Sequence, residues 1–511
     1  MSAPLLRDYQ RDVVHRVENE IASGRRRPCV VAPTGSGKTL IAAELTRRAT
    51  GRGERVIFIV QRRELTNQTS QKLHAVGIDH GIVQAGFPAR PGARVQICSI
   101  QTLHARAMRT RAIDLPPADL LFIDECHHAR ARTYERLIAS YPNPVIIGLT
   151  ATPCRTDGRG LGNLFETLIE CPSVAALTKD GHLVPARVYA PTRPDLTGVK
   201  VRLGDYVETQ LAERMNTARL VGDIVEHWHR LGEGRRTVVF TVNVAHSVHI
   251  RDEFRRSGVL AEHIDGRTPL EERKRSLAAF AAGTVDVVCN CAVLTEGWDR
   301  PEASCLILAR PTKSLGLYRQ MLGRVLRPAP EVGKKGALIL DHAGAVFLHG
   351  LPDDEIVWRL SEDRRAENAT HSRRGQRLHA PALTTCPECS AVRFEGRPCL
   401  ECGWHVVKKP KSVEVAEGEL GEVGRDRSVR ANAYKPEEKQ RFHKQLLWIA
   451  KERRRQSGWA AHAYKAKFGS WPDAPPWALP EPERPDAAMR AWVRSRDIAY
   501  AKAMAKQLAA S

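Results

Sequence analysis

Residues 28–45, PCVVAPTGSGKTLIAAEL, constrain the fold of this chain more than any other part of its sequence. An apolar run at 29–32 is followed by a loop with two glycines and then by apolar residues at the spacing of a helix. Glycines let backbone N–H groups point at phosphate oxygens, and the start of the following helix adds positive potential. A chance glycine-rich turn is the alternative. Such a turn would not be expected to have both a strand before it and Gly-Lys-Thr after it, and this segment has both. The stretch therefore predicts a parallel α/β domain with a phosphate-binding loop.

The loop itself supplies candidate ligands for ATP and its metal ion. Lys38 would neutralise the β- and γ-phosphates, and Thr39 would offer its hydroxyl to Mg²⁺. Ala32 stands where such a loop usually has its first glycine. The candidate nucleotide-binding residues of the loop are Thr34, Gly35, Ser36, Gly37, Lys38 and Thr39.

A second apolar run, residues 120–123, leads into the sequence DECHH. Ligands of open parallel sheets bind at the carboxyl ends of strands, so we expect Asp124 to hold Mg²⁺ and Glu125 to polarise the attacking water. A zinc centre is the alternative, but neighbouring residues on one short segment rarely place four ligands tetrahedrally. Cys126 is then expected to be a packing residue, and His127 a polar link to neighbouring elements.

Composition limits the class of protein. A chain of 511 residues is too long for one hydrophobic core and suggests about three domains. It has no apolar run of about twenty residues and no signal-peptide core at its start, so we expect a cytoplasmic protein without a membrane partner. The twelve cysteines are then thiols or metal ligands. A formal charge of +21 favours a nucleic-acid partner, although a merely soluble surface is the alternative.

Two Cys-x₂-Cys pairs separated by nine residues form a metal-binding pattern. The segment is too short for a core of its own, and metal binding supplies on the order of 10–16 kcal/mol of apparent folding energy in small zinc peptides. Free thiols or a redox pair are the alternatives, and His405 is close enough to replace one cysteine. The expected Zn²⁺ ligands are Cys386, Cys389, Cys399 and Cys402.

From residue 6 to about residue 330 the motifs and their order resemble the superfamily 2 helicases of the DExH group. The resemblance implies that Gln10, in LRDYQ, contacts adenine; an ordinary exposed helix residue is the alternative. Segments 56–65 and 98–103 are similar to motifs that touch the nucleic-acid backbone. The residues that these two segments offer for nucleic-acid contact are Arg63, Gln101 and Thr102.

The segment IGLTATP, residues 147–153, resembles the motif of that group that couples ATP hydrolysis to the nucleic-acid track. Thr150 and Thr152 would be its coupling hydroxyls. His127 would join them in coupling hydrolysis to DNA. Read alone, the segment is a hydrophobic strand that ends in a polar turn, which is common.

Residues 318–328, YRQMLGRVLRP, place Gln320, Arg324 and Arg327 on one helix face. A solvated basic face is the alternative, but the pattern resembles the group's last motif, whose arginines reach the γ-phosphate from the second domain. Such an arginine can raise the rate by about 10³–10⁵ and makes hydrolysis depend on closure of the cleft. In LTEGWDRP, residues 294–301, the nucleotide-side residues would be Gly297 and Asp299. The expected catalytic residues are therefore Lys38, Asp124, Glu125, Gln320, Arg324 and Arg327.

The cysteine pairs and a basic, aromatic tail narrow the resemblance to RadD-like bacterial DNA-repair helicases and their phage relatives. In the tail, the aromatic residues Trp459, Tyr464, Phe468 and Trp471 are interleaved with Lys465 and Lys467, a pattern that suits single-stranded bases and phosphates. Aromatic residues of a small helical module are more often its core, and mixed use is the third interpretation. The expected fold is α/β, with two tandem RecA-like (P-loop) domains that have parallel sheets, then a small zinc ribbon and a helical C-terminal tail.

The expected domain boundaries follow from these motifs and from composition. They are 1–195 for the first RecA-like domain, 215–345 for the second, 346–380 for a linker, 381–410 for the zinc ribbon, 411–433 for a second linker and 434–511 for the tail.

Taken together, the sequence predicts an ATP-dependent DNA helicase or translocase of repair or recombination, with ATP, Mg²⁺ and Zn²⁺ as cofactors. Its expected partner is single-stranded or branched DNA, with single-stranded-DNA-binding or recombination proteins as further candidates. Three alternatives stay open: the motor subunit of a restriction system, an RNA helicase, and an ATP-switched DNA-binding protein that does not unwind. No nuclease-type Asp…Glu-x-Lys cluster follows the motor motifs, which weighs against the restriction subunit.

Overall fold

A computed structural model gives the fold of the chain as two compact units, residues 1–408 and 409–511, which are described separately. No helix among its described residues is long and apolar enough to cross a membrane. The described residues are 6–128, 132–141, 143–155, 160–191, 194–202, 204–232, 234–295, 297–361, 367–368, 382–405, 434–456, 458–473 and 478–508.

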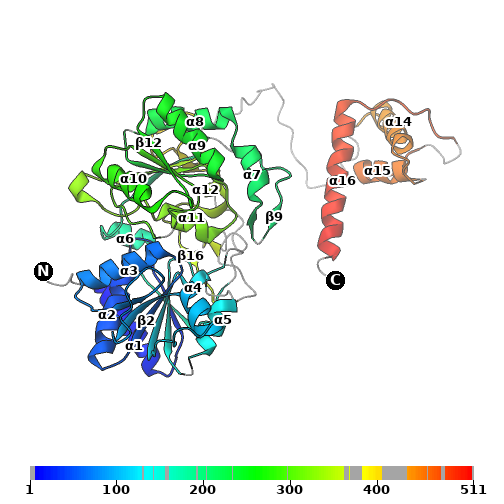
Figure 1. The fold of residues 1–511 in the computed structure, drawn as a ribbon. Helices are drawn as coiled ribbons and strands as arrows, with labels where there is room; N and C mark the ends of the chain where they lie inside the picture. Colours follow the sequence, from blue (N-terminus) through cyan, green and yellow to red (C-terminus); the bar gives the residue numbers. More distant parts are fainter. Residues whose placement is uncertain are drawn as a thin grey trace. The chain divides into compact units, whose positions relative to one another are not determined.

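Seven parallel strands form the sheet of the first domain (Figure 1). They are β1 (Pro28–Val31), β2 (Val56–Val60), β3 (Gly81–Val83), β4 (Val95–Ser99), β5 (Leu120–Asp124), β6 (Val145–Thr150) and β7 (Thr167–Glu170). Their spatial order is β3-β4-β2-β5-β6-β1-β7. Strands β1, β2 and β4 are buried along their whole length because helices cover both faces of the sheet. The two apolar runs of the sequence, at 29–32 and 120–123, are thus confirmed as central strands.

The helices divide between the two faces of this sheet. On one face, α1, α2 and α3 share a core with Val30, Phe58 and Phe122. On the other face, the short elements after β4 and the helix α5 pack on Ile57 and Ile123. Their bounds are α1 (Asp8–Ala22), α2 (Lys38–Gly51), α3 (Arg63–Ala75), α4 (Ile100–Thr102), the π-helical η1 (Leu103–Arg109), the 3₁₀ turn η2 (Cys126–His128) and α5 (Arg132–Ala139).

Six parallel strands form the sheet of the second domain. They are β8 (Ala186–Tyr189), β11 (Thr237–Phe240), β12 (Ala261–Ile264), β13 (Val287–Asn290), β14 (Cys305–Leu308) and β15 (Ala337–Asp341). Their order is β12-β13-β11-β14-β15-β8, so the strand that comes first along the chain lies at one edge and pairs with the last. The expected boundary at residue 195 is therefore too late, because β8 already belongs to the second sheet.

Helices also cover both faces of the second sheet. Helices α8 and α9 share one core with Val239 and Ile307, and α10, α11 and α12 share the other with Val238 and Leu306. These helices and the smaller elements of the unit are α6 (Val174–Lys179), the hairpin β9 (Val201–Arg202) and β10 (Asp205–Tyr206), α7 (Glu208–Met215), α8 (Ala218–Leu231), α9 (Val244–Arg256), α10 (Leu270–Ala282), α11 (Leu315–Leu322), η3 (Pro330–Val332) and α12 (Ala345–His349).

The segment after β15 continues the packed domain. Val346 of α12 is fully buried, and Ile356 and Trp358 pack on the same core. Further on, the backbone of Leu360 accepts a hydrogen bond from Gly162 of the first domain, at 2.7 Å. The first part of the expected linker 346–380 is thus ordered against both domains, with β16 (Ile356–Val357) pairing with β17 (Glu367–Asn368). Most of the rest of that linker, and all of the expected linker 411–433, lie outside the described residues.

The cysteine-rich segment is a small hairpin, β18 (Leu383–Thr385) with β19 (Val392–Phe394), flanked by the two Cys-x₂-Cys turns. It docks on the outer edge of β8: Ala391 bridges Tyr189, and the backbone N–H of Ala190 donates to the carbonyl oxygen of Ser390 at 3.1 Å. Cys386 and Cys399 are buried in the core that α8 and α9 also line. The hairpin therefore closes the exposed edge of the second sheet.

The second unit is a helical module, as the composition of the tail predicts. Its helices are α14 (Pro436–Glu452), α15 (Trp459–Phe468) and α16 (Ala487–Leu508). Leu446, Ile449, Tyr464, Phe468 and Val493 form its core. Two of the tail aromatics are thus packing residues.

Candidate nucleotide site

Three motifs lie at the ends of the adjacent strands β1, β5 and β6 of the first sheet. They are the phosphate loop, the DECHH motif and the segment IGLTATP of residues 147–153. In register, Val31 of β1 lies beside Thr150 of β6, and Leu149 of β6 lies beside Asp124 of β5. Because parallel strands end at the same edge, all three motifs meet there. Helix α2 begins at Lys38, so its first turn faces the same edge.

Buried charges dominate the centre of this edge. Lys38 Nζ donates to Glu125 Oε1 at 2.8 Å, and the two side chains are only 15% and 11% exposed. Burial acts to lower the pKa of Lys38, but the carboxylates of Glu125 and Asp124 more than offset this and raise it. Burial and the neighbouring Glu125 charge raise the pKa of Asp124 to about 6, against the opposing charge of Lys38. Glu125 also has a left-handed backbone (φ 47°), a strain typical of functional positions.

Gln10 and Tyr9 support the phosphate loop from behind. Gln10 is buried; its Nε2 donates to the carbonyl oxygen of Ser36 at 2.9 Å, and its Oε1 accepts from the backbone of Arg7 at 3.0 Å. The hydroxyl of Tyr9 donates to the same oxygen of Ser36 at 2.6 Å. A Cβ on Gly37 would lie 2.5 Å from Gln10 Nε2, so the close approach requires glycine there. Gln10 is therefore not an ordinary exposed residue, and in this structure it contacts the loop.

His127 joins the two domains. Gln320, on α11 of the second domain, donates from Nε2 to His127 Nε2 at 3.1 Å. The other ring nitrogen, Nδ1, therefore carries the proton; it lies 3.1 Å from Thr150 Oγ1 and 3.4 Å from Glu125 Oε2. Thr150 Oγ1 in turn accepts from the backbone N–H of Thr152 at 3.0 Å. The three expected coupling residues and Gln320 thus form one hydrogen-bonded chain.

The prediction that Gln320, Arg324 and Arg327 lie on one helix face is wrong, because α11 ends at Leu322 and both arginines lie beyond its end. The two arginines lie at different places. Arg324 is buried and donates to the backbone carbonyls of Thr295 (2.6 Å) and Trp298, and its charge also opposes that of Lys38. Arg327 pairs with Asp299 and lies over the phosphate loop, where a Cβ on Gly35 would be 2.9 Å from Arg327 Cγ. Arg327 is thus the arginine that directly overlies the loop.

Residues 297–299 belong to the second domain and face helix α3 of the first domain. Gly297 has a left-handed backbone (φ 66°) and lies against Glu64 and Leu65 of α3. Trp298 is buried in the core beside Phe280, which fits the packing interpretation of this residue.

The three candidates for nucleic-acid contact lie after β2 and β4. Arg63 is exposed, with its guanidinium 5.1 Å from the ring centre of Phe87. Gln101 is exposed and accepts from Ser99 Oγ at 2.9 Å, while the backbone N–H of Thr102 is capped by the same hydroxyl. None of these hydrogen bonds or ring contacts reaches the charged cluster around Lys38.

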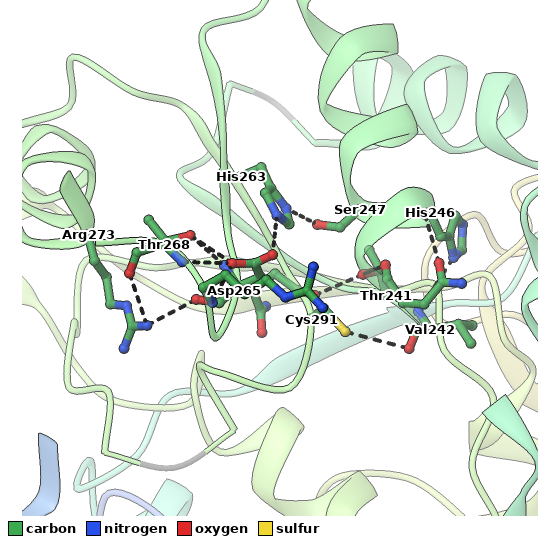
Figure 2. A network of polar contacts seen from close by, with 12 residues as sticks. Thr241, Val242, His246, Ser247, His263, Asp265, Thr268, Arg273 and Cys291 are labelled. Carbon is green, nitrogen blue, oxygen red and sulfur yellow. Dashed lines mark hydrogen bonds and ion pairs between the residues drawn. The ribbon is translucent and has the colours of Figure 1, made fainter. Parts of the chain in front are cut away.

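A polar network at the carboxyl ends of β11 and β12 was not predicted (Figure 2). Asp265 accepts from the backbone N–H groups of Arg267 and Thr268, each at 2.8 Å, and lies near His263. Arg273 donates to the carbonyl oxygen of Asp265 at 3.0 Å and reaches across to Glu64 of the first domain. The local signal was present as the turn sequence DGRTP, residues 265–269, but it does not reveal the partner Glu64.

The four predicted zinc ligands come together. The Sγ atoms of Cys386, Cys389, Cys399 and Cys402 lie within 4.8 Å of one another, and two of the pairs are 3.6 Å apart. Thiolates at about 2.3 Å from a tetrahedral Zn²⁺ lie about 3.8 Å apart, so the cluster fits the ion. Cys126 instead packs against Cys29, with a Sγ–Sγ distance of 3.6 Å, and among the described residues it joins no metal-binding group.

Two family matches agree with this division of the chain. Residues 4–155 match the family described as "Type III restriction enzyme, res subunit", and residues 219–329 match the "Helicase conserved C-terminal domain". Together the two domains indicate a superfamily 2 helicase, an ATP- and Mg²⁺-using enzyme of the DNA-dependent ATPase class.

Two relatives and one solved structure are similar to this chain at below 30% sequence identity. A "51.5 kDa protein" of Lactococcus phage (isolate 7-9) is 29% identical over 73% of this chain and 77% of its own length. The "Putative ATP-dependent helicase IRC3" of Saccharomyces cerevisiae is 29% identical over 72% of this chain, which spans only 56% of that relative. Among solved structures, a fragment of "a putative HsdR subunit of a type I restriction enzyme" from Vibrio vulnificus YJ016 has the same fold (TM-score 0.54, 21% identity, 70% of this chain and 69% of that one).

Proposed function

We propose that the chain is a DNA-dependent ATPase motor whose ATP site is split between the two domains. The observation that carries this proposal is the chain of contacts Gln320–His127–Glu125–Lys38, which runs from the second domain into the charged centre of the first. A site of this kind is complete only when the domains are closed, so hydrolysis and domain movement are coupled.

Each residue then has a separate role. Lys38 offsets the charge of the β- and γ-phosphates, and the loop N–H groups from Thr34 to Thr39 bind their oxygens. Asp124 and the Thr39 hydroxyl offer the oxygen ligands that Mg²⁺ prefers, and the ion would neutralise developing phosphate charge. Glu125 orients the attacking water, and Arg327 approaches the γ-phosphate from the second domain. Arg324 holds the backbone of Thr295 and Trp298 in place beside it.

DNA is the proposed track, and repair or recombination the proposed context. The excess of 79 Lys and Arg over 58 Asp and Glu supports a polyanionic partner. The structure "ATP-dependent Type ISP restriction-modification enzyme LlaBIII bound to DNA", which shares the fold at a TM-score of 0.51, concerns a protein that acts on DNA. The RadD-like assignment and the cytoplasmic location stay predictions.

The helical module supports a second DNA contact. Residues 434–508 contain sixteen Lys and Arg against eight Asp and Glu. Trp471 is 49% exposed with Lys465 Nζ 4.3 Å from its ring centre, and Trp448 is also exposed. Exposed aromatic rings beside lysines suit stacking with single-stranded bases.

Phosphate release in the presence of different nucleic acids tests the proposal. Wild-type protein should hydrolyse ATP faster with single-stranded or forked DNA than with RNA, and Lys38→Ala should lose at least about a hundredfold in DNA-stimulated rate. Lys179→Ala, which changes an exposed lysine of α6, is the control and should keep the rate. Turnover in Lys38→Ala at the wild-type level would overturn the site. Stronger stimulation by RNA would favour an RNA helicase, and strand displacement on forked DNA separates an unwinding enzyme from an ATP switch.

A further inference from the structure

Helix α3 of the first domain presents one polar face to the second domain. Glu64, Gln68 and Lys72 are four residues apart, so they lie in a row on this face, here called the α3 stripe. Each member contacts a different group: Glu64 pairs with Arg273, Gln68 Nε2 donates to the carbonyl oxygen of Gly297, and Lys72 Nζ lies 3.4 Å from Asp299 Oδ2.

The first two contacts fix the register between the domains. Arg273 is held before it reaches the stripe, because its Nη2 donates to the backbone carbonyls of Asp265 (3.0 Å) and Thr268 (3.5 Å) (Figure 2). Gly297 has no side chain, and a Cβ there would lie 3.3 Å from Glu64 Cβ. The stripe therefore meets a preformed surface.

The third contact, between Lys72 and Asp299, leads on to Arg327, the arginine that overlies the phosphate loop. Asp299 pairs with Lys72 through Oδ2 and with Arg327 through Oδ1, and its side chain is 34% exposed. Burial acts to raise the pKa of Asp299, but the charges of Arg327 and Lys72 more than offset this and hold it below its ordinary value. Asp299 thus lies between a lysine of the first domain and the arginine that overlies the phosphate loop.

This arrangement creates a competition for Arg327. To stabilise charge on the γ-phosphate, the guanidinium has to leave Asp299. If Arg327 were the sole partner of Asp299, its departure would leave a partly buried carboxylate unpaired. The free-energy cost of that unpaired charge would be added to the barrier for hydrolysis. Lys72 stays beside Asp299 when Arg327 turns away, so the cost is reduced.

We propose that Lys72 is a positioning residue for ATP hydrolysis, which keeps Asp299 paired while Arg327 moves to the nucleotide. The proposal rests on the proposed function, because it assigns Arg327 to the phosphate. Arg63, the candidate for nucleic-acid contact, is the first residue of the helix that carries the α3 stripe.

Steady-state ATPase kinetics of full-length Lys72→Met, with saturating DNA, test this role. We expect kcat to fall about tenfold with KM for ATP unchanged within about twofold, because the cost arises only when Arg327 leaves Asp299. Lys72→Arg should restore kcat, since it keeps a cation beside Asp299. Lys179→Met, the same change at an exposed lysine of α6, should have wild-type kinetics.

A double-mutant cycle with Asp299→Asn separates positioning from structure. Without the carboxylate, Lys72→Met should add no further loss, so the double variant should match Asp299→Asn alone. An unchanged kcat in Lys72→Met, or an equal loss with and without Asp299, would overturn the proposal. A rise in KM together with a lower unfolding temperature, at unchanged kcat, would mean a purely structural contact and would overturn it too. A wild-type chain that hydrolyses no ATP would instead refute the proposed function, and the inference with it.

Discussion

Single residues in the ATP site depend on one another because they share a poorly solvated space. Lys38, Asp124 and Glu125 form two negative charges and one positive charge with little access to water. Each protonation state is therefore set by its neighbours. The left-handed backbone of Glu125 adds a local cost that the sheet around it has to offset.

The raised pKa of Asp124 predicts an acid limb in the pH profile of ATP hydrolysis. Mg²⁺ binding needs the ionised carboxylate, and the pKa of Asp124 is about 6, so kcat/KM should fall as pH drops through about 6. The free energy of unfolding changes in the opposite direction, rising as pH falls. The raised pKa of Asp124 destabilises the fold above about pH 6, and this destabilisation disappears as pH falls from about 6 toward the ordinary pKa of an aspartate. More Mg²⁺ should shift the limb to lower pH, since metal and proton compete. A limb below pH 5 at low Mg²⁺ would contradict the assignment.

The motif residues of the first domain lie at the strand ends that the sequence indicates, whereas several pairs of residues that join the two domains were missed. Lys38, Asp124 and Glu125 follow apolar strands in short, recognisable patterns. Glu64 and Arg273 are 209 positions apart, and Gln68 and Gly297 are 229 apart. No local pattern encodes such pairs, although the spacing of four along α3 could have marked a contact face.

Among the elements, the cysteine hairpin has the clearest separate role. Its bridge to Tyr189 and its buried cysteines make it part of the core of the second domain. We therefore interpret it as a structural site rather than as a mobile finger.

Loss of the predicted zinc should therefore destabilise the second domain. We expect about one zinc per chain by elemental analysis, and its loss in Cys389→Ser/Cys402→Ser should lower the unfolding temperature by several degrees, at about 2–4 °C per kcal/mol for a domain of this size. Cys291→Ser, outside the cluster, should keep the zinc. Metal loss without any change in the unfolding temperature would argue against the structural role.

The exposed ring of Trp471 predicts a contribution to single-strand binding. Base stacking on an aromatic ring is worth about 1–3 kcal/mol, so Trp471→Ala should weaken the affinity for single-stranded DNA by about fivefold or more. Trp471→Phe should keep most of the affinity, and Leu479→Ala, an exposed apolar residue of the same module, should keep all of it. Fluorescence anisotropy with labelled oligonucleotides measures this. Equal affinities for wild type and Trp471→Ala would leave Trp471 without a role in binding.

The order of elements was easier to predict than their membership in a domain. Residues 186–189 have the composition of a strand, but nothing in them shows which sheet they join. The stretch 346–380 is predicted to be a linker because it is polar overall, yet its first part packs because Val346 and Trp358 contact the second core. Membership is decided by tertiary contacts that periodicity does not carry.

At the scale of the whole molecule, the proposed function depends on close approach of the two parallel-sheet domains. Gly323 of the second domain faces Thr34 of the phosphate loop: an added Cβ would lie 2.8 Å from Thr34 Cγ2 and closer still to Thr34 Cβ. A side chain at Gly323 would therefore keep the domains apart. Contacts such as Gln320–His127, which lie beside this point, would then be lost.

Gly323→Val should separate nucleotide binding from hydrolysis. The first domain keeps its loop, so we expect ATP binding within about threefold of wild type while kcat falls by at least about a hundredfold through loss of Arg327. Gly316→Ala on α11 is a matched control, because its Cβ would be 3.4 Å from Thr152 Oγ1, an ordinary contact. Equilibrium binding of a fluorescent ATP analogue and phosphate release measure the two steps. Wild-type kcat in Gly323→Val would show that hydrolysis needs no such approach.

The edge position of β8 also has a consequence for how the chain reaches its native state. Tyr189 pairs with Leu340 on one side and with Ala391 on the other, so both neighbours of β8 are made at least 150 residues after it. On the ribosome, β8 leaves the exit tunnel long before either partner exists, while the first sheet is already complete with β7. Such long-range pairing slows folding. We expect the first domain to fold first during synthesis and the second to finish only once residues 337–394 have been made, with β8 as the exposed strand in the interval.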